Sequence, residues 1–201
     1  MCLIVIEGID GAGKSTQRKK LVEWFTAAKS GELVASCEPT DVGYGAKLRR
    51  AASSGGCPNI ATEVAWFMAD RRDHVERLVA PALAADKTVL LDRYIPSSMA
   101  YQSRAGSTFT PQQILDLNLA IAPKWDLLII IDVPVEVAME RLERRGLPAE
   151  SYERNDFLTH CRNTYTQIEG AVIIDGDATE TAVHRRIVEA VQNHLEGVAA
   201  K

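Results

Sequence analysis

The sequence lacks the features that mark secreted, membrane-spanning and nucleic-acid-binding proteins. Its four cysteines (Cys2, Cys37, Cys57 and Cys161) form no C-x-x-C pair and no grouping with histidine, which favours free thiols in a reducing compartment. The N-terminus shows no basic segment or cleavage site of a signal peptide, and no apolar run approaches membrane-spanning length. The net charge of −4 gives no general basic field. We therefore expect a cytoplasmic protein whose partners are small phosphorylated ligands rather than a membrane or a nucleic acid polymer.

The chain also lacks internal repeats, low-complexity segments and linker-like stretches. Its 201 residues are 46% hydrophobic and 25% charged, which suits one globular domain over residues 1–201. Apolar segments with helical patterns between them predict strands near 2–7, 33–37, 87–92, 126–132 and 171–175. This alternation predicts an α/β fold, a five-stranded parallel sheet with helices on both faces. Ligands of such sheets bind at the carboxyl ends of the strands.

A glycine-rich loop follows the first expected strand. Residues 8–15 read GIDGAGKS and match the G-x-x-x-x-G-K-S spacing of a phosphate-binding loop, with a helix beginning at the lysine. The backbone N–H groups, the helix N-terminus and the lysine would hold the phosphates of ATP. An ordinary glycine-rich turn is the alternative, and the complete motif disfavours it. The expected ATP-binding residues here are Gly8, Asp10, Gly11, Ala12, Gly13, Lys14, Ser15 and Thr16.

An aspartate and an arginine end the third expected strand, in the segment VLLDRYIPSSMAYQ (89–102). Asp92 at this position favours coordination of Mg²⁺ together with the hydroxyl of Ser15. Arg93 would face a second anion. The alternative for Asp92 is a helix N-cap, and by itself the residue fits both roles.

A helix is expected over EVAWFMADRRDHVERL, residues 63–78. Phe67 and Arg71 lie four residues apart and share one face, where a ring could stack on a flat ligand and a guanidinium could bind its edge. Without further context, a core phenylalanine and a solvated arginine explain this pair better.

A basic cluster follows the fourth expected strand. Arg141, Arg144 and Arg145 lead into a segment interrupted by glycine and proline, which predicts a short lid at approximately 141–156. Because the loop carries no basic residue before Lys14, arginines from a lid would supply positive charge for phosphoryl transfer. The alternative is a salt-bridged helix surface, since glutamates are interleaved with the arginines.

Taken together, these motifs resemble the thymidylate (dTMP) kinases, a family of nucleoside monophosphate kinases with the P-loop NTPase fold. The segments IVIEGIDGAGKSTQ, EVAWFMADR, DRYIPSSMAYQ and IDGDATETAVHRRI correspond in order and spacing over essentially the whole chain. The resemblance implies transfer of the γ-phosphoryl group of ATP to dTMP with Mg²⁺, and a homodimer. The catalytic residues we expect are Lys14, Arg93, Arg144 and Arg145.

The resemblance also assigns roles on the acceptor side. It implies that Phe67 stacks on thymine, Arg71 contacts its carbonyl edge and Tyr101 lies under the deoxyribose. Arg93 and Arg49 would bind the acceptor phosphate, and Arg141 would pack on adenine. The implied substrate-binding residues are Asp10, Glu38, Pro39, Arg49, Phe67, Arg71, Arg93, Ser97, Ser98, Tyr101, Gln102 and Tyr152.

Two positions depart from the family pattern. Cys37 stands where the family carries an arginine before Glu-Pro, near the substrate phosphate. Ser151 stands where the family carries a lid arginine, which leaves lid catalysis to Arg144, Arg145 or Arg154.

Three other functions share parts of this pattern. A GTP-dependent switch needs N-K-x-D, and PKWD (123–126) offers proline in place of asparagine, so it more simply marks the entry to the fourth strand. A non-catalytic nucleotide-binding module is disfavoured by the intact Lys14, Ser15, Asp92 and Arg93. A kinase for another deoxynucleotide or for nucleosides stays open, because single changes around Ser98 and Gln102 could alter base choice.

Overall fold

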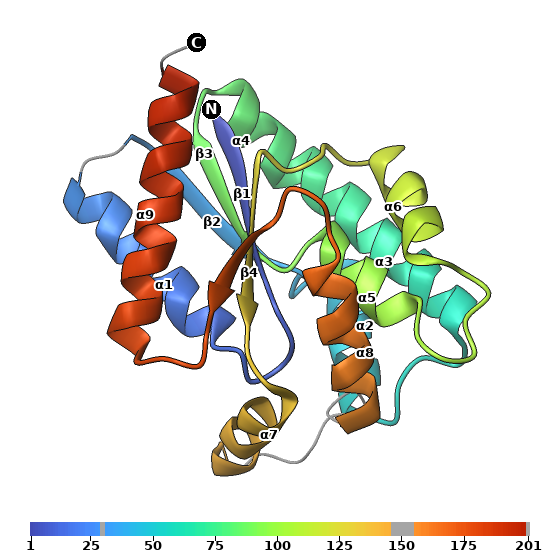
Figure 1. Ribbon diagram of the computed structural model, residues 1–201. Coiled ribbons are helices and arrows are strands. Elements are labelled where there is room, and N and C mark those ends of the chain that lie inside the picture. The colour runs from blue at the N-terminus through green and yellow to red at the C-terminus, as the bar shows by residue number, and fades with distance from the viewer. Residues whose placement is uncertain (29–30, 146–154, 200–201) are drawn as a thin grey trace.

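The computed structural model describes residues 1–28, 31–145 and 155–199 and is built around one parallel β-sheet (Figure 1). The strand order is β2-β3-β1-β4-β5, and all pairs are parallel. Each strand lies within one residue of its expected bounds, which confirms the expected fold class. The strands are β1 (Cys2–Glu7), β2 (Leu33–Cys37), β3 (Thr88–Asp92), β4 (Leu127–Asp132) and β5 (Val172–Asp175).

Helices cover both faces of the sheet, as expected for parallel strands (Figure 1). On one side lie α1 (Lys14–Ala28) and α9 (Glu180–Ala199), and on the other lie α3 (Ile60–His74), α5 (Ile95–Gln102) and α8 (Asn155–Thr166). The remaining elements are α2 (Gly43–Ser53), the π-helical turn η1 (Val75–Val79), α4 (Ala80–Ala84), α6 (Pro111–Leu119) and α7 (Val135–Arg144).

The central strands form because their sequences are apolar without alternation. Every residue of β1, CLIVIE, is buried, and β4, LLIIID, is buried up to its last residue. A strand covered on both faces needs apolar side chains in both directions, so these runs suit the middle of the sheet. The edge strand β5 is only partly buried.

Local hydrogen bonds fix where several elements begin. The Asn59 side chain accepts from the Thr62 N–H at the start of α3, and Thr110 with Gln113 forms a capping box at the start of α6. The carboxylate of Asp126 accepts from the Leu3 N–H at 2.7 Å. This contact gives the aspartate of PKWD a structural role at the entry to β4, as expected.

The strand register brings the site together. Asp92, at the end of β3, lies beside Ile6 of β1 and Cys37 of β2. The loops that follow these strands therefore meet at one edge of the sheet. Within the described part of the chain, no helix is both long and apolar enough to cross a bilayer.

Candidate active site

The glycine-rich loop lies against β4 and α7 so closely that two of its glycines have no room for a side chain. Gly8 (φ 145°) and Gly11 (φ 84°) have backbone conformations that other residues rarely adopt. A Cβ at Gly8 would lie 2.5 Å from the Ile131 carbonyl oxygen, and one at Gly11 would lie 2.5 Å from that of Ala138. The loop is thus fixed in place before any phosphate arrives.

Lys14 is buried at the first position of α1. Its Nζ donates to the carbonyl oxygens of Gly8 and Ile9, both at 2.9 Å. Burial lowers the pKa of Lys14 to about 8, and the nearby Arg93 acts in the same direction. The carboxylates of Asp10, Asp92 and Glu7 oppose this shift only in part, so the negative charge of a phosphate group in the loop would favour the charged amine further.

The two expected magnesium ligands meet at the end of β3. The hydroxyl of Ser15 donates to Oδ2 of Asp92 at 2.8 Å. Hydroxyl and carboxylate oxygens suit Mg²⁺, which takes only one or two protein ligands and completes its shell with phosphates and water. Accordingly, the described residues include no cluster of three or more His, Cys, Asp or Glu side chains that could hold a metal by itself. The pair fits a magnesium ion that arrives with a nucleotide.

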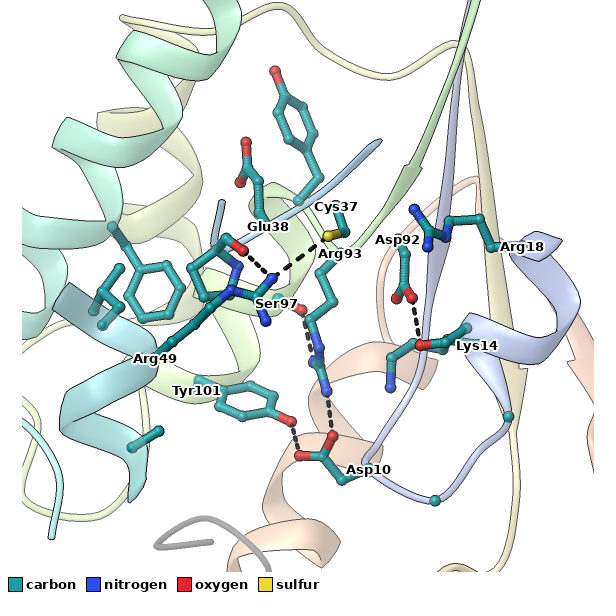
Figure 2. A pocket seen from close by; sticks show the side chains of 18 of the residues that line it. Asp10, Lys14, Arg18, Cys37, Glu38, Arg49, Asp92, Arg93, Ser97 and Tyr101 are labelled. Carbon is teal, nitrogen blue, oxygen red and sulfur yellow. Dashed lines mark hydrogen bonds and ion pairs between the residues drawn. The ribbon is translucent and has the colours of Figure 1, made fainter. Parts of the chain in front are cut away.

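Arg93 and Asp10 form the centre of the cleft (Figure 2). Arg93 pairs with Oδ1 of Asp10 and donates to the Ser97 hydroxyl at 3.1 Å. Tyr101 donates to Oδ2 of the same aspartate at 2.6 Å, and the guanidinium of Arg93 lies 5.1 Å from its ring centre. Burial would raise the pKa of Asp10, but Arg93 and Lys14 outweigh it and lower that pKa to about 2. The backbone of Arg93 has φ 70°, which is uncommon for a non-glycine residue. In this conformation the Arg93 side chain reaches Asp10 of the loop.

The buried carboxyl group of Glu7 supports this arrangement through hydrogen bonds to α5 and α8. Glu7 accepts from the N–H groups of Tyr94 (2.7 Å) and Ser97 (3.0 Å), from the Ser97 hydroxyl (2.7 Å) and from the Tyr165 hydroxyl (3.1 Å). Burial raises the pKa of Glu7, although Arg93 and these hydrogen bonds oppose the shift. Glu7 therefore ties the glycine-rich loop's strand to the start of α5, which carries Ser97 and Tyr101.

Arg71 is 1% exposed and belongs to a buried polar network. Its Nε and Nη2 lie 2.9 and 2.8 Å from Oε2 of Glu38, and its Nη1 donates to the Ser98 hydroxyl at 3.1 Å and to Oδ1 of Asn118. His74 Nδ1 lies 3.0 Å from the other oxygen of Glu38. The alternative of a solvated arginine is therefore wrong, because this side chain is held rigidly at the wall of a cavity.

One cleft of about 740 Å³ joins the phosphate-binding loop, Arg93 and Arg71. It is lined by the loop, by Phe67 and Arg71 of α3, and by the residues that follow β2 and β3. The expected site residues that line it are Asp10, Gly11, Gly13, Lys14, Ser15, Thr16, Glu38, Pro39, Arg49, Phe67, Arg71, Asp92, Arg93, Ser97, Tyr101, Gln102, Arg141 and Arg145.

A few expected residues lie elsewhere. Gly8 and Ala12 belong to the loop but are not among the residues that line the cleft. Ser98 does not line the cleft either and accepts a hydrogen bond from Arg71. Arg144 is exposed and donates to the Glu140 carbonyl oxygen at 3.3 Å. Tyr152, like Ser151, Arg154 and most of the expected lid, falls outside the described residues.

Arg141 links the two sides of the nucleotide end of the cleft. Its Nη2 donates to the Gly176 carbonyl oxygen at 3.0 Å, and its Nη1 reaches that of Gly11 at 3.5 Å. The guanidinium thus lies between the glycine-rich loop and the segment after β5, where a flat ring above the loop would meet it.

The sequence analysis missed Arg18. This residue lies one helical turn after Lys14 and lines the cleft, with Nη1 3.4 Å from the Ser36 carbonyl oxygen. Its Nε is buried and has no partner among the described residues. Arg49 approaches Cys37 Sγ at 3.5 Å, so Arg18 and Arg49 put positive charge around Cys37, the position at which the resemblance implies an arginine. The i, i+4 spacing from Lys14 was the available signal.

The parallel sheet, the loop with its lysine, and the Ser15–Asp92 pair define a nucleotide-binding protein of the P-loop class. The chain matches the model of the thymidylate kinase family over residues 6–187. It therefore belongs to the thymidylate kinase family.

Individual relatives agree with this assignment. The chain is 39% identical to a thymidylate kinase of Xanthomonas oryzae pv. oryzae (strain PXO99A) over 204 residues, covering 98% of this chain and 88% of the relative. It is 41% identical to a thymidylate kinase of Akkermansia muciniphila over 198 residues, covering 98% and 94%. A crystal structure of thymidylate kinase from Ehrlichia chaffeensis superposes with a TM-score of 0.75 at 25% identity, covering 95% of this chain and 98% of the other.

Proposed function

We propose that the protein transfers the γ-phosphoryl group of ATP to dTMP and so produces dTDP and ADP. The observation that carries this proposal is a single cleft lined both by the phosphate-binding loop and by Phe67 and Arg71. A donor nucleotide at one end and an acceptor base at the other would bring their phosphates together near Arg93.

On the donor side, Lys14 and the loop N–H groups hold the β- and γ-phosphates, and Arg141 packs on adenine. Ser15 and Asp92 hold Mg²⁺, which offsets phosphate charge when bound. A non-bridging oxygen of the dTMP phosphate attacks the γ-phosphorus, and the bond to the β–γ bridging oxygen breaks. The electron pair leaves with ADP, and no protein base is required, because the attacking phosphate oxygen is already anionic.

On the acceptor side, Phe67 stacks on the base while Arg71 donates to its carbonyl edge. Tyr101 and Asp10 lie at the sugar, and their mutual hydrogen bond keeps both in place. Arg93, Arg49 and Arg18 provide positive charge at the acceptor phosphate. Arg145, which already lines the cleft, and Arg144 add charge during transfer.

The test is ADP release with a panel of nucleosides and nucleoside monophosphates. We expect dTMP to be turned over with the highest kcat/KM and nucleosides not at all. Lys14→Ala should keep the fold, shown by circular dichroism, and lose transfer, because the phosphates lose their central charge. ADP release that does not depend on any acceptor would contradict the proposal, and preference for another monophosphate would change the substrate.

We also propose that the enzyme works in the cytoplasm as a homodimer. The free cysteines support the first point, and family resemblance supports the second. Analytical ultracentrifugation at working enzyme concentration would test the dimer, and a monomer retaining full activity would refute it.

A further inference from the structure

The side-chain amide of Gln102 has a hydrogen-bond partner for its nitrogen but none among the described residues for its oxygen. Gln102 ends α5, is 1% exposed and lines the cleft. Its amide nitrogen donates to Oε1 of Glu63 at 3.1 Å. Its amide oxygen is buried and has no hydrogen-bond partner among the described residues. A buried acceptor without a partner costs free energy, so its place on a ligand cavity calls for a ligand that donates to it.

Glu63 is in turn held by Arg104. The Glu63 side chain is 1% exposed, and Arg104 donates to both of its oxygens, at 2.9 Å to Oε1 and 2.6 Å to Oε2. Arg104 also donates to the carbonyl oxygen of Tyr101 at 2.7 Å, which anchors it to the end of α5. The guanidinium therefore balances the buried charge of Glu63 and fixes the position of its oxygens.

This arrangement decides which way the Gln102 amide faces. A carboxylate accepts hydrogen bonds and cannot donate them, so only the NH₂ group of the amide can face Glu63. The reversed amide would place two acceptor oxygens against each other. The amide atom of Gln102 that is left without a protein partner is consequently always the acceptor.

Arg71 supplies the complementary donor. Glu63, Phe67 and Arg71 follow at intervals of four along α3 and so share one face. Among the described residues, Nη2 of Arg71 has no partner beyond Glu38, which leaves N–H capacity for a ligand. A base stacked on Phe67 between Arg71 and Gln102 would meet one donor and one acceptor. Thymine and uracil present a carbonyl group to the donor Arg71 and an N3–H to the acceptor Gln102. Cytosine would instead present an amino group to the donor and an unprotonated N3 to the acceptor, so neither pair could form a hydrogen bond.

We propose that Glu63 and Arg104 are positioning residues that lock the Gln102 amide as an acceptor and thereby make the site select pyrimidines with an N3–H over cytosine. This inference rests on the proposed function, since it concerns the acceptor base of the same cleft. Neither residue touches the base; both act through Gln102.

The test compares dTMP with dCMP in kinetics and in calorimetric binding. Glu63→Gln removes the carboxylate and lets the Gln102 amide turn, so we expect the preference in kcat/KM for dTMP over dCMP to fall about tenfold, the effect of about one hydrogen bond. The change should lie in the KM and Kd of dTMP, with kcat at saturating dTMP nearly unchanged. Arg104→Gln should shift the preference in the same direction, and Arg104→Lys, which keeps the charge, should shift it less.

The variant Gln102→Leu shows whether Glu63 acts by orienting the Gln102 amide or through a general effect on the structure. In this background Glu63→Gln should leave the dTMP-to-dCMP preference unchanged, because the group that it orients is gone. Asp73→Asn is the matched control: it removes a carboxylate from the same helix and from an arginine pair, but at an exposed site away from the cleft. It should leave preference and kcat as in the wild type.

A preference within about twofold of the wild type in folded Glu63→Gln would overturn the inference, since that change is far below the effect of one hydrogen bond. The same outcome in Arg104→Gln would overturn it if Glu63→Gln fails to fold. Wild-type protein that does not turn over dTMP would instead refute the proposed function, and the two failures are therefore distinct.

Discussion

Raising the pH from 7 to 9 should weaken ATP binding by about tenfold, because Lys14 loses its proton in this range. Burial places the pKa of the ligand-free lysine at about 8. The amine is then about nine-tenths protonated at pH 7 and about one-tenth protonated at pH 9. Phosphates bind the charged form, and their negative charge raises its pKa in the complex. The loss of the competent form corresponds to about 1.4 kcal/mol of binding free energy.

Asp10 and Tyr101, which lie beside Lys14 and Arg93 in the cleft, do not titrate in the same interval. The pKa of Asp10 is about 2, and burial raises that of Tyr101 well above its ordinary value. Both keep one protonation state from pH 7 to 9. The sign is therefore set by Lys14: affinity is full below its ligand-free pKa and falls as pH rises through it.

Calorimetric titration with Mg·ATP, without dTMP, would measure this effect. Two buffers of different ionisation enthalpy should reveal an uptake of about half a proton per ATP at pH 8. Lys14→Arg is the control, because a guanidinium stays charged throughout and should show no such uptake. Equal wild-type affinities at pH 7 and pH 9 would refute the reasoning and imply that the loop lysine keeps its proton when buried.

Three further predictions concern the acceptor and the transferring group. Phe67→Ala and Arg71→Ala should raise the KM for dTMP far more than that for ATP; failure of both variants to fold would instead favour a core role. Arg18→Ala should raise the KM for dTMP about tenfold, and Cys37→Arg in that background should restore it; no change in the single variant would place Arg18 outside phosphate binding. Arg144→Ala/Arg145→Ala should lower kcat about 10³-fold while the calorimetric Kd for dTMP stays within about tenfold. Of the two single variants, Arg145→Ala should lower kcat more, because Arg145 lines the cleft and Arg144 does not. An unchanged kcat would leave both as a solvated helix surface.

Sequence alone was sufficient for the sheet and the phosphate loop because both depend on local patterns. A buried strand such as β1 needs an unbroken apolar run, and the loop needs glycines at positions that a Cβ would block. The strand order was not predicted. It depends on which apolar edges pair across long stretches of chain, and the pattern of each strand by itself carries no information about its neighbour.

The sequence also did not predict which side chains orient the residues of the site. Arg71 as a base-contacting candidate came from spacing and resemblance, but the sequence did not reveal that Glu38 would hold it with Ser98 and Asn118 as further partners. These partners are separated from Arg71 by tens of residues. Isolated Glu, Ser and Asn residues are ordinary surface residues by composition, and only burial in the fold makes them part of the site.

The two ends of the cleft rely on different physics, and this determines which substitutions each can tolerate. In the proposed site, Lys14, Arg18, Arg49 and Arg93 at the phosphate end would act through charge, which extends over several ångströms and can be supplied from more than one element. An arginine on α1 could therefore stand in for one that is missing at Cys37. Base recognition would instead depend on which atom of the Gln102 amide faces the ligand, and hydrogen bonds weaken steeply when they are misaligned. We therefore expect positive charge at the phosphates to tolerate a change of position, and the orientation of the Gln102 amide to tolerate none.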